Sequence, residues 1–221
     1  MEPLERMEDF FAARVDLYEE HMMTNVRGIA EAYQRMADLL PENAATLLDL
    51  GCGTGLELAP IFAKLPNLHV TGVDMTRAML DKLAQKHPSR KMSLICGDYF
   101  TIDLGARRFD AAVSFQTLHH LSHDEKRSLY QKIRRSLRKG GIYVEADYVV
   151  GTQVEEDEGF AARERFLRDH LGNESAVDAK AYHIDVPCTA DNLARLLREA
   201  GFLRVRQDRA WENMAILVAV A

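Results

Sequence analysis

The sequence has few cysteines, no long apolar run and no excess of positive charge. Its three cysteines, Cys52, Cys96 and Cys188, form no CxxC pattern, so we predict neither a disulfide framework nor a zinc or iron–sulfur site. The longest uninterrupted apolar run, 214–221, falls far short of the roughly 20 residues that a transmembrane helix needs. The N-terminus is acidic where a signal peptide is basic. We therefore expect a cytoplasmic protein without membrane association.

The charge balance argues against nucleic acid as a partner. The chain carries 28 basic and 34 acidic residues, a net charge of −6, which gives no long-range attraction to a phosphate backbone. Hydrophobic residues at 47% and charged residues at 28% exclude a largely disordered chain. A length of 221 residues favours one substantial domain over two.

Strand and helix patterns alternate from Thr46 onward, which predicts an α/β fold. Before Thr46, apolar residues recur at helical spacing and predict one or two amphipathic helices, with a division near Thr24 and Asn25. We expect strands at 46–50, 69–73, 92–96, 109–115, 142–149, 203–208 and 214–220. We expect helices at 56–65, 76–86, 124–138, 155–171 and 189–200. The last two strands read as an antiparallel hairpin, so the sheet has about seven strands.

The strongest motif is a glycine-rich loop, Asp49-Leu-Gly51-Cys-Gly53-Thr-Gly55, between the first strand and the helix that follows it. Glycines there permit a sharp turn and a close approach of the backbone to a ligand. The nicotinamide dinucleotide fingerprint needs a further glycine where Leu56 or Leu58 stands, and a P-loop needs a lysine that the loop lacks. The spacing of the glycines disfavours NAD as the cofactor, and the absence of a lysine disfavours nucleoside triphosphates.

Two further motifs stand in order after the glycine-rich loop: Gly97-Asp98 follows the third expected strand, and Leu137-Arg-Lys-Gly-Gly141 precedes the fifth. In this order of motifs the sequence resembles the class I S-adenosylmethionine-dependent methyltransferases. The likeness is strong over about 46–149 and is nearest to the small-molecule branch that includes ubiquinone and menaquinone biosynthesis methyltransferase-like proteins. It implies a Rossmann-like, doubly wound, mostly parallel seven-stranded sheet. It also implies a single domain over 1–221, with a helical lid at 1–40, the cofactor-binding core at 46–149, a second helical lid or insertion at 151–187, and a C-terminal helix and hairpin at 189–221.

The resemblance carries the cofactor contacts over residue by residue. Asp74 stands where the family places an acid that accepts both ribose hydroxyl protons, and Asp98 stands where an acid accepts the exocyclic amine of adenine. The resemblance also implies that Tyr99 lies beside the adenine ring. The remaining members of the predicted cofactor-binding set are Asp49, Gly51, Cys52, Gly53, Met75, Gly97, Ser114 and Tyr18.

A structural role explains three residues at least as well as a functional role does. Cys52 is also explained as a small residue that fills space, and Tyr18 is explained equally well by core packing as by closure over cofactor or substrate. Asp110 is better explained as a carboxylate that fixes a loop than as a ligand contact.

The candidate catalytic residues follow the fourth strand. Methyl transfer from a sulfonium is an in-line displacement, and a base is needed only when the acceptor must lose a proton. Ligands bind at the carboxyl ends of strands in open α/β sheets, where this chain places His119 and His120. Because no two histidines stand at the spacing typical of metal ligands, we predict no metal.

The acceptor is expected to be a small molecule, and the protein a monomer or homodimer. Aromatic residues outside the cofactor motifs supply apolar surface for enclosing such a molecule. They are Phe10, Phe11, Tyr18, Tyr33, Phe160, Phe166, Tyr182 and, as an added ring, His183. The alternative function is a non-catalytic protein of the same fold that binds S-adenosylmethionine or S-adenosylhomocysteine.

Overall fold

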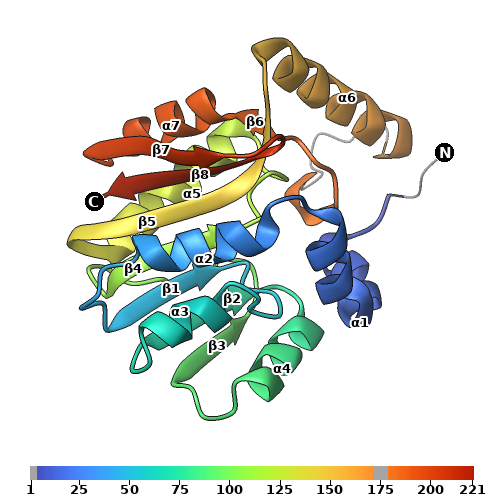
Figure 1. Ribbon diagram of the computed structural model, residues 1–221. Helices are drawn as coiled ribbons and strands as arrows, with labels where there is room; N and C mark the ends of the chain where they lie inside the picture. Colours follow the sequence, from blue (N-terminus) through green and yellow to red (C-terminus); the bar gives the residue numbers. More distant parts are fainter. Residues whose placement is uncertain (1–3, 172–178) are drawn as a thin grey trace.

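The computed structural model describes residues 4–171 and 179–221, and it has one central sheet with helices on both faces (Figure 1). Parts of the two expected lids, 1–3 and 172–178, lie outside the described residues. The strands are β1 (Thr46–Leu50), β2 (His69–Asp74), β3 (Met92–Cys96), β4 (Phe109–Phe115), β5 (Leu137–Val150), β6 (Cys188–Thr189), β7 (Arg204–Ala210) and β8 (Met214–Val220). The helices are α1 (Met7–Asn25), α2 (Ile29–Leu39), α3 (Leu58–Lys64), α4 (Arg77–Lys86), α5 (His123–Ser136), α6 (Gln153–Leu171) and α7 (Ala190–Glu199), with a 3-10 turn, η1, at Ala179–Ala181.

The strand order is β3-β2-β1-β4-β5-β8-β7, and the two-residue β6 pairs with β5 beside this path. β1 to β5 run parallel to one another, whereas β8 is antiparallel to both β5 and β7. The predicted Rossmann-like, mostly parallel sheet with an antiparallel C-terminal hairpin is confirmed. All five parallel strands therefore end at the same edge of the sheet, where the chain places its glycine loop and its paired histidines.

Both faces of the central strands are covered, which explains their nearly continuous apolar sequences. Leu47 packs into one core together with residues of α2 and α3, while the adjacent Leu48 packs into the other core with residues of α5 and α7. Both side chains are fully buried. A strand buried on both faces forms a rigid base for the loop that follows it.

The N-terminal region divides into two helices at Gly28, close to the predicted division. Gly28 has a φ of +78°, and a Cβ atom there would lie 2.4 Å from the Trp211 ring. Only glycine tolerates both the left-handed backbone and the close contact with the hairpin turn. The break lets α1 turn away from the sheet toward the carboxyl edge of the strands, on the right of Figure 1.

Two local expectations need correction. β5 begins at Leu137 rather than at Ile142, because Leu137 leaves α5 in an extended conformation and pairs with Phe109 before a register shift. Thr76 precedes α4, but its hydroxyl caps no helix N–H group; Asp74 accepts the Thr76 N–H instead, at 2.8 Å. In contrast, Ser122 and Glu125 form a complete capping box at the start of α5.

Asp110 has the structural role that the sequence favours. Its Oδ2 accepts the backbone N–H groups of Ala45 and Thr46 at 3.0 Å each, and its Oδ1 accepts a hydrogen bond from Arg138. Partial burial raises the pKa of Asp110, but the hydrogen bonds from Arg138 and the loop outweigh burial and hold the pKa below its usual value. The carboxylate thus ties the start of β1 to β4, at the end of the sheet opposite the cofactor loop.

Replacing Asp110 with Asn is expected to lower the Tm by roughly 2–6 °C, because hydrogen bonds to a charged acceptor contribute on the order of 1.5 kcal/mol. A carboxylate with a lowered folded-state pKa stabilises the fold above its ordinary pKa, and that contribution is lost as pH falls through the folded-state pKa. The Tm difference between the two proteins should therefore narrow below about pH 4. Thermal melts between pH 3 and 8 test this, and a difference that is constant with pH would contradict it.

Candidate active site

The glycine loop is bound to the ends of two neighbouring strands. The N–H groups of Gly51 and Cys52 both donate to the Val73 carbonyl, at 2.8 and 3.2 Å, and Gly53 N–H donates to Asp74 Oδ2 at 2.8 Å. Gly51 has a φ of +66°, and a Cβ there would lie 2.1 Å from Thr117 Oγ1. The loop after β1 is therefore closed against β2 on one side and against the loop after β4 on the other.

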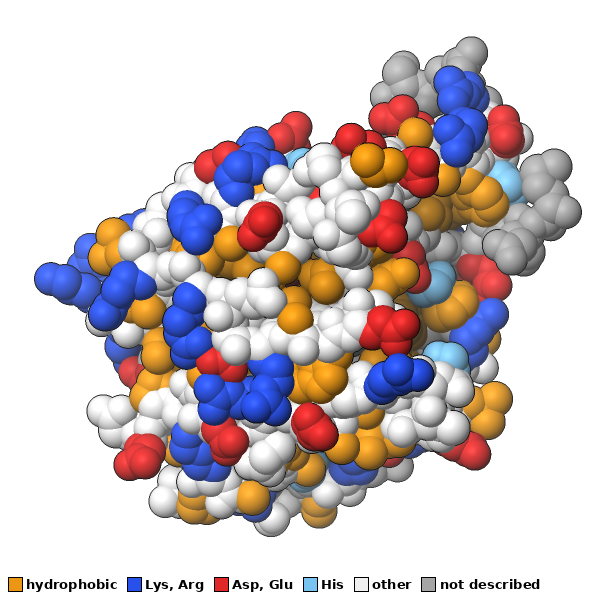
Figure 2. All heavy atoms as spheres, turned by 45° about the horizontal axis from the view of Figure 1, so that its top comes forward, with side chains coloured by type: hydrophobic (Ala, Val, Ile, Leu, Met, Phe, Trp, Pro, Cys, Tyr) orange, Lys and Arg blue, Asp and Glu red, His pale blue; other side chains and the backbone are white. Residues whose placement is uncertain are grey.

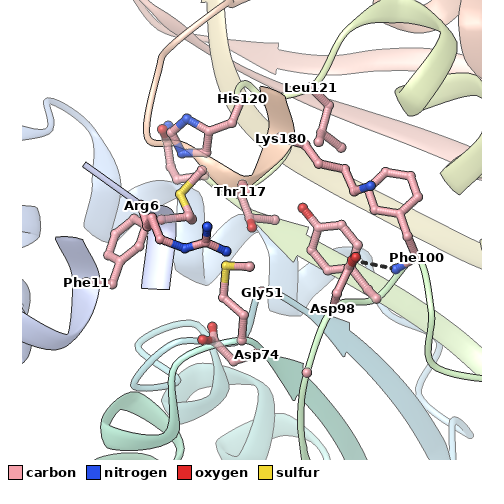
Figure 3. Close-up of a pocket in the computed structure, with 16 residues that line it drawn as sticks. Arg6, Phe11, Gly51, Asp74, Asp98, Phe100, Thr117, His120, Leu121 and Lys180 are labelled. Atoms are coloured by element: carbon pink, nitrogen blue, oxygen red, sulfur yellow. Dashed lines mark hydrogen bonds between the residues drawn. The ribbon is translucent and has the colours of Figure 1, made fainter. Parts of the chain in front are cut away.

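A cavity of about 230 Å³, which we call the cofactor cavity, opens beside this loop. Asp74 and Asp98, which follow β2 and β3, lie on its wall, and the Arg6 guanidinium extends into it from the N-terminal segment (Figure 3). Asp98 Oδ1 accepts the Phe100 N–H at 2.8 Å, drawn as the dashed line. Of the predicted cofactor set, the cavity lining contains Gly51, Asp74, Met75, Gly97, Asp98 and Tyr99.

Beneath the loop, Asp49 and Glu57 form a pair of buried carboxylates. Neither oxygen of Asp49 has a hydrogen-bond partner within the described part of the chain, and Asp49 is 1% exposed. Burial, followed by the charge of Glu57, raises the pKa of Asp49 well above its usual value, and burial also raises the pKa of Glu57. A ligand that brings positive charge or N–H groups to this loop, as the amino-acid part of S-adenosylmethionine does, fits these uncompensated acids.

Five residues of the predicted cofactor set do not line the cofactor cavity: Asp49, which lies beneath the loop, and Cys52, Gly53, Ser114 and Tyr18. The Ser114 hydroxyl lies 2.7 Å from the Tyr143 hydroxyl inside the core, and Cys52 is buried with its sulfur against Gly72. Gly53 and Tyr18 instead face each other in a smaller cavity that Asp74 and Gly51 also line. Ser114 fails because β4 alternates its side chains, and position 114 faces the α5 and α7 side of the sheet, toward Tyr143 of β5.

His119 and His120 both lie at the site and differ in environment. His119 Nδ1 lies 2.6 Å from Asp147 Oδ1, and His120 Nδ1 lies 3.1 Å from Asp185 Oδ1. Burial alone would lower the pKa of His119, but the Asp147 carboxylate outweighs burial and raises the pKa. Burial and the neighbouring His119 lower the pKa of His120 to about 4. The pair therefore offers one imidazole oriented by a carboxylate and one that is neutral at neutral pH.

A second cavity, of about 550 Å³, lies against the first; we call it the acceptor cavity. It is lined by α1 on one side and by the loop after β4 on the other, and it contains both His119 and His120. The two cavities share Phe11, Gln116 and His120 in their linings. In Figure 2, histidine side chains reach the surface beside hydrophobic ones on the right of the view, the side that α1 occupies in Figure 1.

Two sequence segments close these cavities and are themselves joined. Phe10 stacks on His183 with ring centroids 3.6 Å apart, and Arg6 forms a backbone bridge with Tyr182. Tyr33, also expected in the lids, instead packs on Phe115 in the core.

The sequence did not identify several residues of the site. Asp147, Asp185, Arg6 and Lys180 stand in no recognisable motif, and they reach the site only through the fold. One sequence feature indicates a role for Asp147 in the site: it lies near the carboxyl end of β5, at the same edge of the sheet as the glycine loop. Gln116 has another such feature, because it is a polar residue directly after β4, and its φ of +50° is one that non-glycine residues seldom adopt.

Residues 47–141 match the family model described as a methyltransferase domain. The solved structure of a DhpI–SAH complex has the same fold, with a TM-score of 0.70 and 16% identity over 96% of this chain and 93% of that chain. The match to the methyltransferase domain, together with the glycine loop and the two strand-end acids, supports a class I S-adenosylmethionine-dependent methyltransferase with S-adenosylmethionine as its cofactor, and the solved structure shows the same fold. This result favours an enzyme over the non-catalytic alternative.

Two kinds of curated protein are similar to this chain. The carboxy-S-adenosyl-L-methionine synthase of Campylobacter lari is 24% identical over 228 residues, which cover 98% of this chain and 96% of that protein. The O-methyltransferase cnsE of Penicillium expansum is 29% identical over 182 residues, which cover 80% of this chain but only 58% of cnsE. The ubiquinone and menaquinone branch is not singled out and stays a prediction. No helix in the described ranges is long and apolar enough to cross a membrane.

Replacing Asp74 with Ala is expected to lower the affinity for S-adenosylmethionine at least about tenfold, because hydrogen bonds to a charged acceptor contribute on the order of 1.5–3 kcal/mol. The variant loses the acceptor for the ribose hydroxyls and also the anchor of the Gly53 N–H. Isothermal titration measures the change. Asp81→Ala, which removes an exposed carboxylate paired with Arg77 on α4, is the matched control. Normal binding by a folded Asp74→Ala protein would disprove the assignment.

Proposed function

We propose that this enzyme transfers the methyl group of S-adenosylmethionine to a small molecule bound in the acceptor cavity. The observation that supports this most is the common wall of the two cavities, formed by Phe11, Gln116 and His120. A molecule in the acceptor cavity lies next to a cofactor in the neighbouring one, as an in-line displacement between them requires. The attacking atom forms a bond to the methyl carbon, the carbon–sulfur bond breaks, and its electron pair stays on sulfur to give S-adenosylhomocysteine.

The lining of the acceptor cavity indicates the kind of molecule that it takes. Phe10, Phe11 and Leu17 supply apolar surface, while His119, His120 and Asp185 gather polar groups at one end. Arg14 also lines the cavity, but Glu5 binds its guanidinium through two hydrogen bonds of 3.0 and 3.1 Å. We propose a partly apolar acceptor, in size like an aromatic or prenyl compound, with the atom to be methylated near the histidines.

His119 and His120 are proposed to activate the acceptor. Asp147 fixes the orientation of the His119 ring through Nδ1, so Nε2 is the atom that remains for the acceptor. The Leu118 N–H donates to the other oxygen of Asp147 at 2.9 Å, so the carboxylate is itself held in place. Such a carboxylate–imidazole pair suits an acceptor whose hydroxyl group must lose its proton before it attacks.

Replacing His119 with Ala is expected to lower kcat by on the order of 10²-fold, since activation by a positioned imidazole contributes about that factor or more. The dissociation constant of S-adenosylmethionine should stay within about twofold. Small molecules screened by S-adenosylhomocysteine release supply the acceptor for this measurement. His69→Ala, on the exposed start of β2, is the control. Turnover by His119→Ala at the control rate would show that the histidine takes no part.

The synthase relatives suggest a second function, which is to bind a form of the cofactor whose transferable group carries a carboxylate. Its support in this chain is Arg6, whose guanidinium extends into the cofactor cavity (Figure 3). The Arg6 guanidinium carbon lies 6.0 Å from the centre of the Tyr182 ring, and among the described residues no carboxylate forms an ion pair with Arg6. Lys180 lines the same cavity, so two cations border the place where such a carboxylate would lie.

If this second function holds, Arg6→Ala should lower the affinity for carboxy-S-adenosylmethionine at least about tenfold. The affinity for S-adenosylmethionine, which lacks the extra carboxylate, should change much less. Competition binding with both compounds measures the difference, and Arg6→Lys tests whether charge alone suffices. An equal loss for the two compounds would indicate that Arg6 binds the part of the molecule that they share.

A further inference from the structure

The most unusual side-chain cluster of the acceptor cavity contains His119, His120 and Asp185. One ligand atom from each, a nitrogen from either imidazole and a carboxylate oxygen, lie within 4.8 Å of one another. We propose that these three side chains bind a divalent transition-metal ion, and that this ion binds and activates the acceptor. The role of the ion rests on the proposed methyl transfer, whereas the site itself does not. The sequence predicts no metal because no two histidines stand at the spacing typical of metal ligands, whereas His119 and His120 are adjacent.

The distances from each imidazole to the carboxylate are close to those of ligands on a single ion, while the two imidazole nitrogens lie within 4.8 Å of each other and would have to approach to bind it. His119 Nε2 lies 3.6 Å from Asp185 Oδ1, and His120 Nδ1 lies 3.1 Å from the same oxygen. Ligands about 2.1 Å from a central ion are separated by roughly 3.0–3.4 Å at octahedral or tetrahedral angles. The cluster therefore needs only small side-chain shifts to bind an ion.

The surroundings of the cluster hold it in this arrangement. Asp147 binds the Nδ1 of His119, which leaves Nε2 for the ion; a carboxylate behind a coordinating imidazole is the usual outer partner in metal sites. The Val186 N–H donates to the His119 carbonyl at 2.7 Å, so the backbone next to Asp185 is fastened to the backbone of the histidine pair. Three ligands from two distant segments are thus positioned by backbone and side-chain contacts together.

Exposure distinguishes this cluster from another group of possible ligands in the described chain, His123, Glu156 and Cys188. Glu156 already accepts hydrogen bonds from His123, Asn192 and the Thr189 N–H, and its side chain is fully buried. The Asp185 side chain, in contrast, is 47% exposed and lines the cavity with the two histidines. An ion bound there keeps positions open toward the cavity, as catalytic sites do.

The ligand set indicates which ion it takes. Two imidazoles and one carboxylate suit Zn²⁺, Mn²⁺ or Fe²⁺, whereas Mg²⁺ prefers oxygen ligands throughout. With the ion bound, His119 Nε2 would be a ligand and not the proton acceptor; the ion would instead lower the pKa of a coordinated acceptor hydroxyl, which would release its proton to water. The oxygen then attacks the methyl carbon, and the sulfur departs with its electron pair. This assigns to the acceptor an oxygen able to coordinate a metal, such as a phenol or an enol beside a carbonyl.

The test uses the full chain, stripped with a chelator and titrated with Zn²⁺ against a chromophoric competitor. We expect one ion per chain. The affinity should fall at least about 100-fold in His120→Ala and Asp185→Asn, and about 10–100-fold in Asp147→Asn. His69→Ala and Cys188→Ser, which alter an exposed histidine and the other cluster, should leave it unchanged. A cooperative thermal melt of each variant reports that it is folded.

The outcomes separate this proposal from the proposed function. Absence of stoichiometric Zn²⁺ binding, or binding that survives both His120→Ala and Asp185→Asn, would overturn the site. Methylation of an acceptor at an undiminished rate by the fully stripped enzyme would overturn the role of the ion while leaving methyl transfer intact. Stoichiometric Zn²⁺ binding that the two variants abolish supports the site even when no screened acceptor is methylated, a result that counts against the proposed function alone.

Discussion

The hydrogen bond between the Gly53 N–H and the Asp74 carboxylate connects the two parts of the site that bind the cofactor. At 2.8 Å it fixes the glycine loop to the end of β2, while the second oxygen of Asp74 receives the Thr76 N–H at the start of α4. One side chain therefore sets the position of two loops relative to each other. Because β1 and β2 are neighbouring parallel strands with both faces covered, the loops cannot separate without disturbing the sheet. The cofactor cavity follows from this arrangement.

Most of the fold could be predicted from the sequence, because local patterns determine it. The bounds of β1, β3 and β4 agree with the apolar runs, and the break between α1 and α2 falls close to the predicted point. The start of β5 could not be predicted, since it depends on pairing between Leu137 and a residue 28 positions earlier. Ser114 failed for a similar reason. Its position on a strand was correct, but the face on which it lies is set by neighbouring elements.

The candidate site also contains some residues that local sequence motifs predict and others that only the fold brings together. The predicted residues Gly51, Asp74 and Asp98, in the loops after β1, β2 and β3, line one cavity. The partners of His119 and His120 were not predicted, because Asp147 and Asp185 are distant in sequence and no short motif connects them to the histidines. Cofactor residues in this fold are thus readable from motifs, whereas the acceptor side is assembled from segments that the motifs do not include. This difference matches the chemistry, since one cofactor serves many acceptors.

The bridge between Arg6 and Tyr182 and the stack of Phe10 on His183 have a consequence for the rate of the catalytic cycle. The Glu5 carbonyl also accepts the His183 N–H, at 3.0 Å, so the N-terminal segment and the segment before β6 are joined at consecutive positions. Both segments border the cofactor cavity. A cofactor that enters or leaves past them must first separate this seam. For a cofactor that exchanges along this route, separation of the two segments would set an upper limit on turnover, whatever the rate of the chemical step.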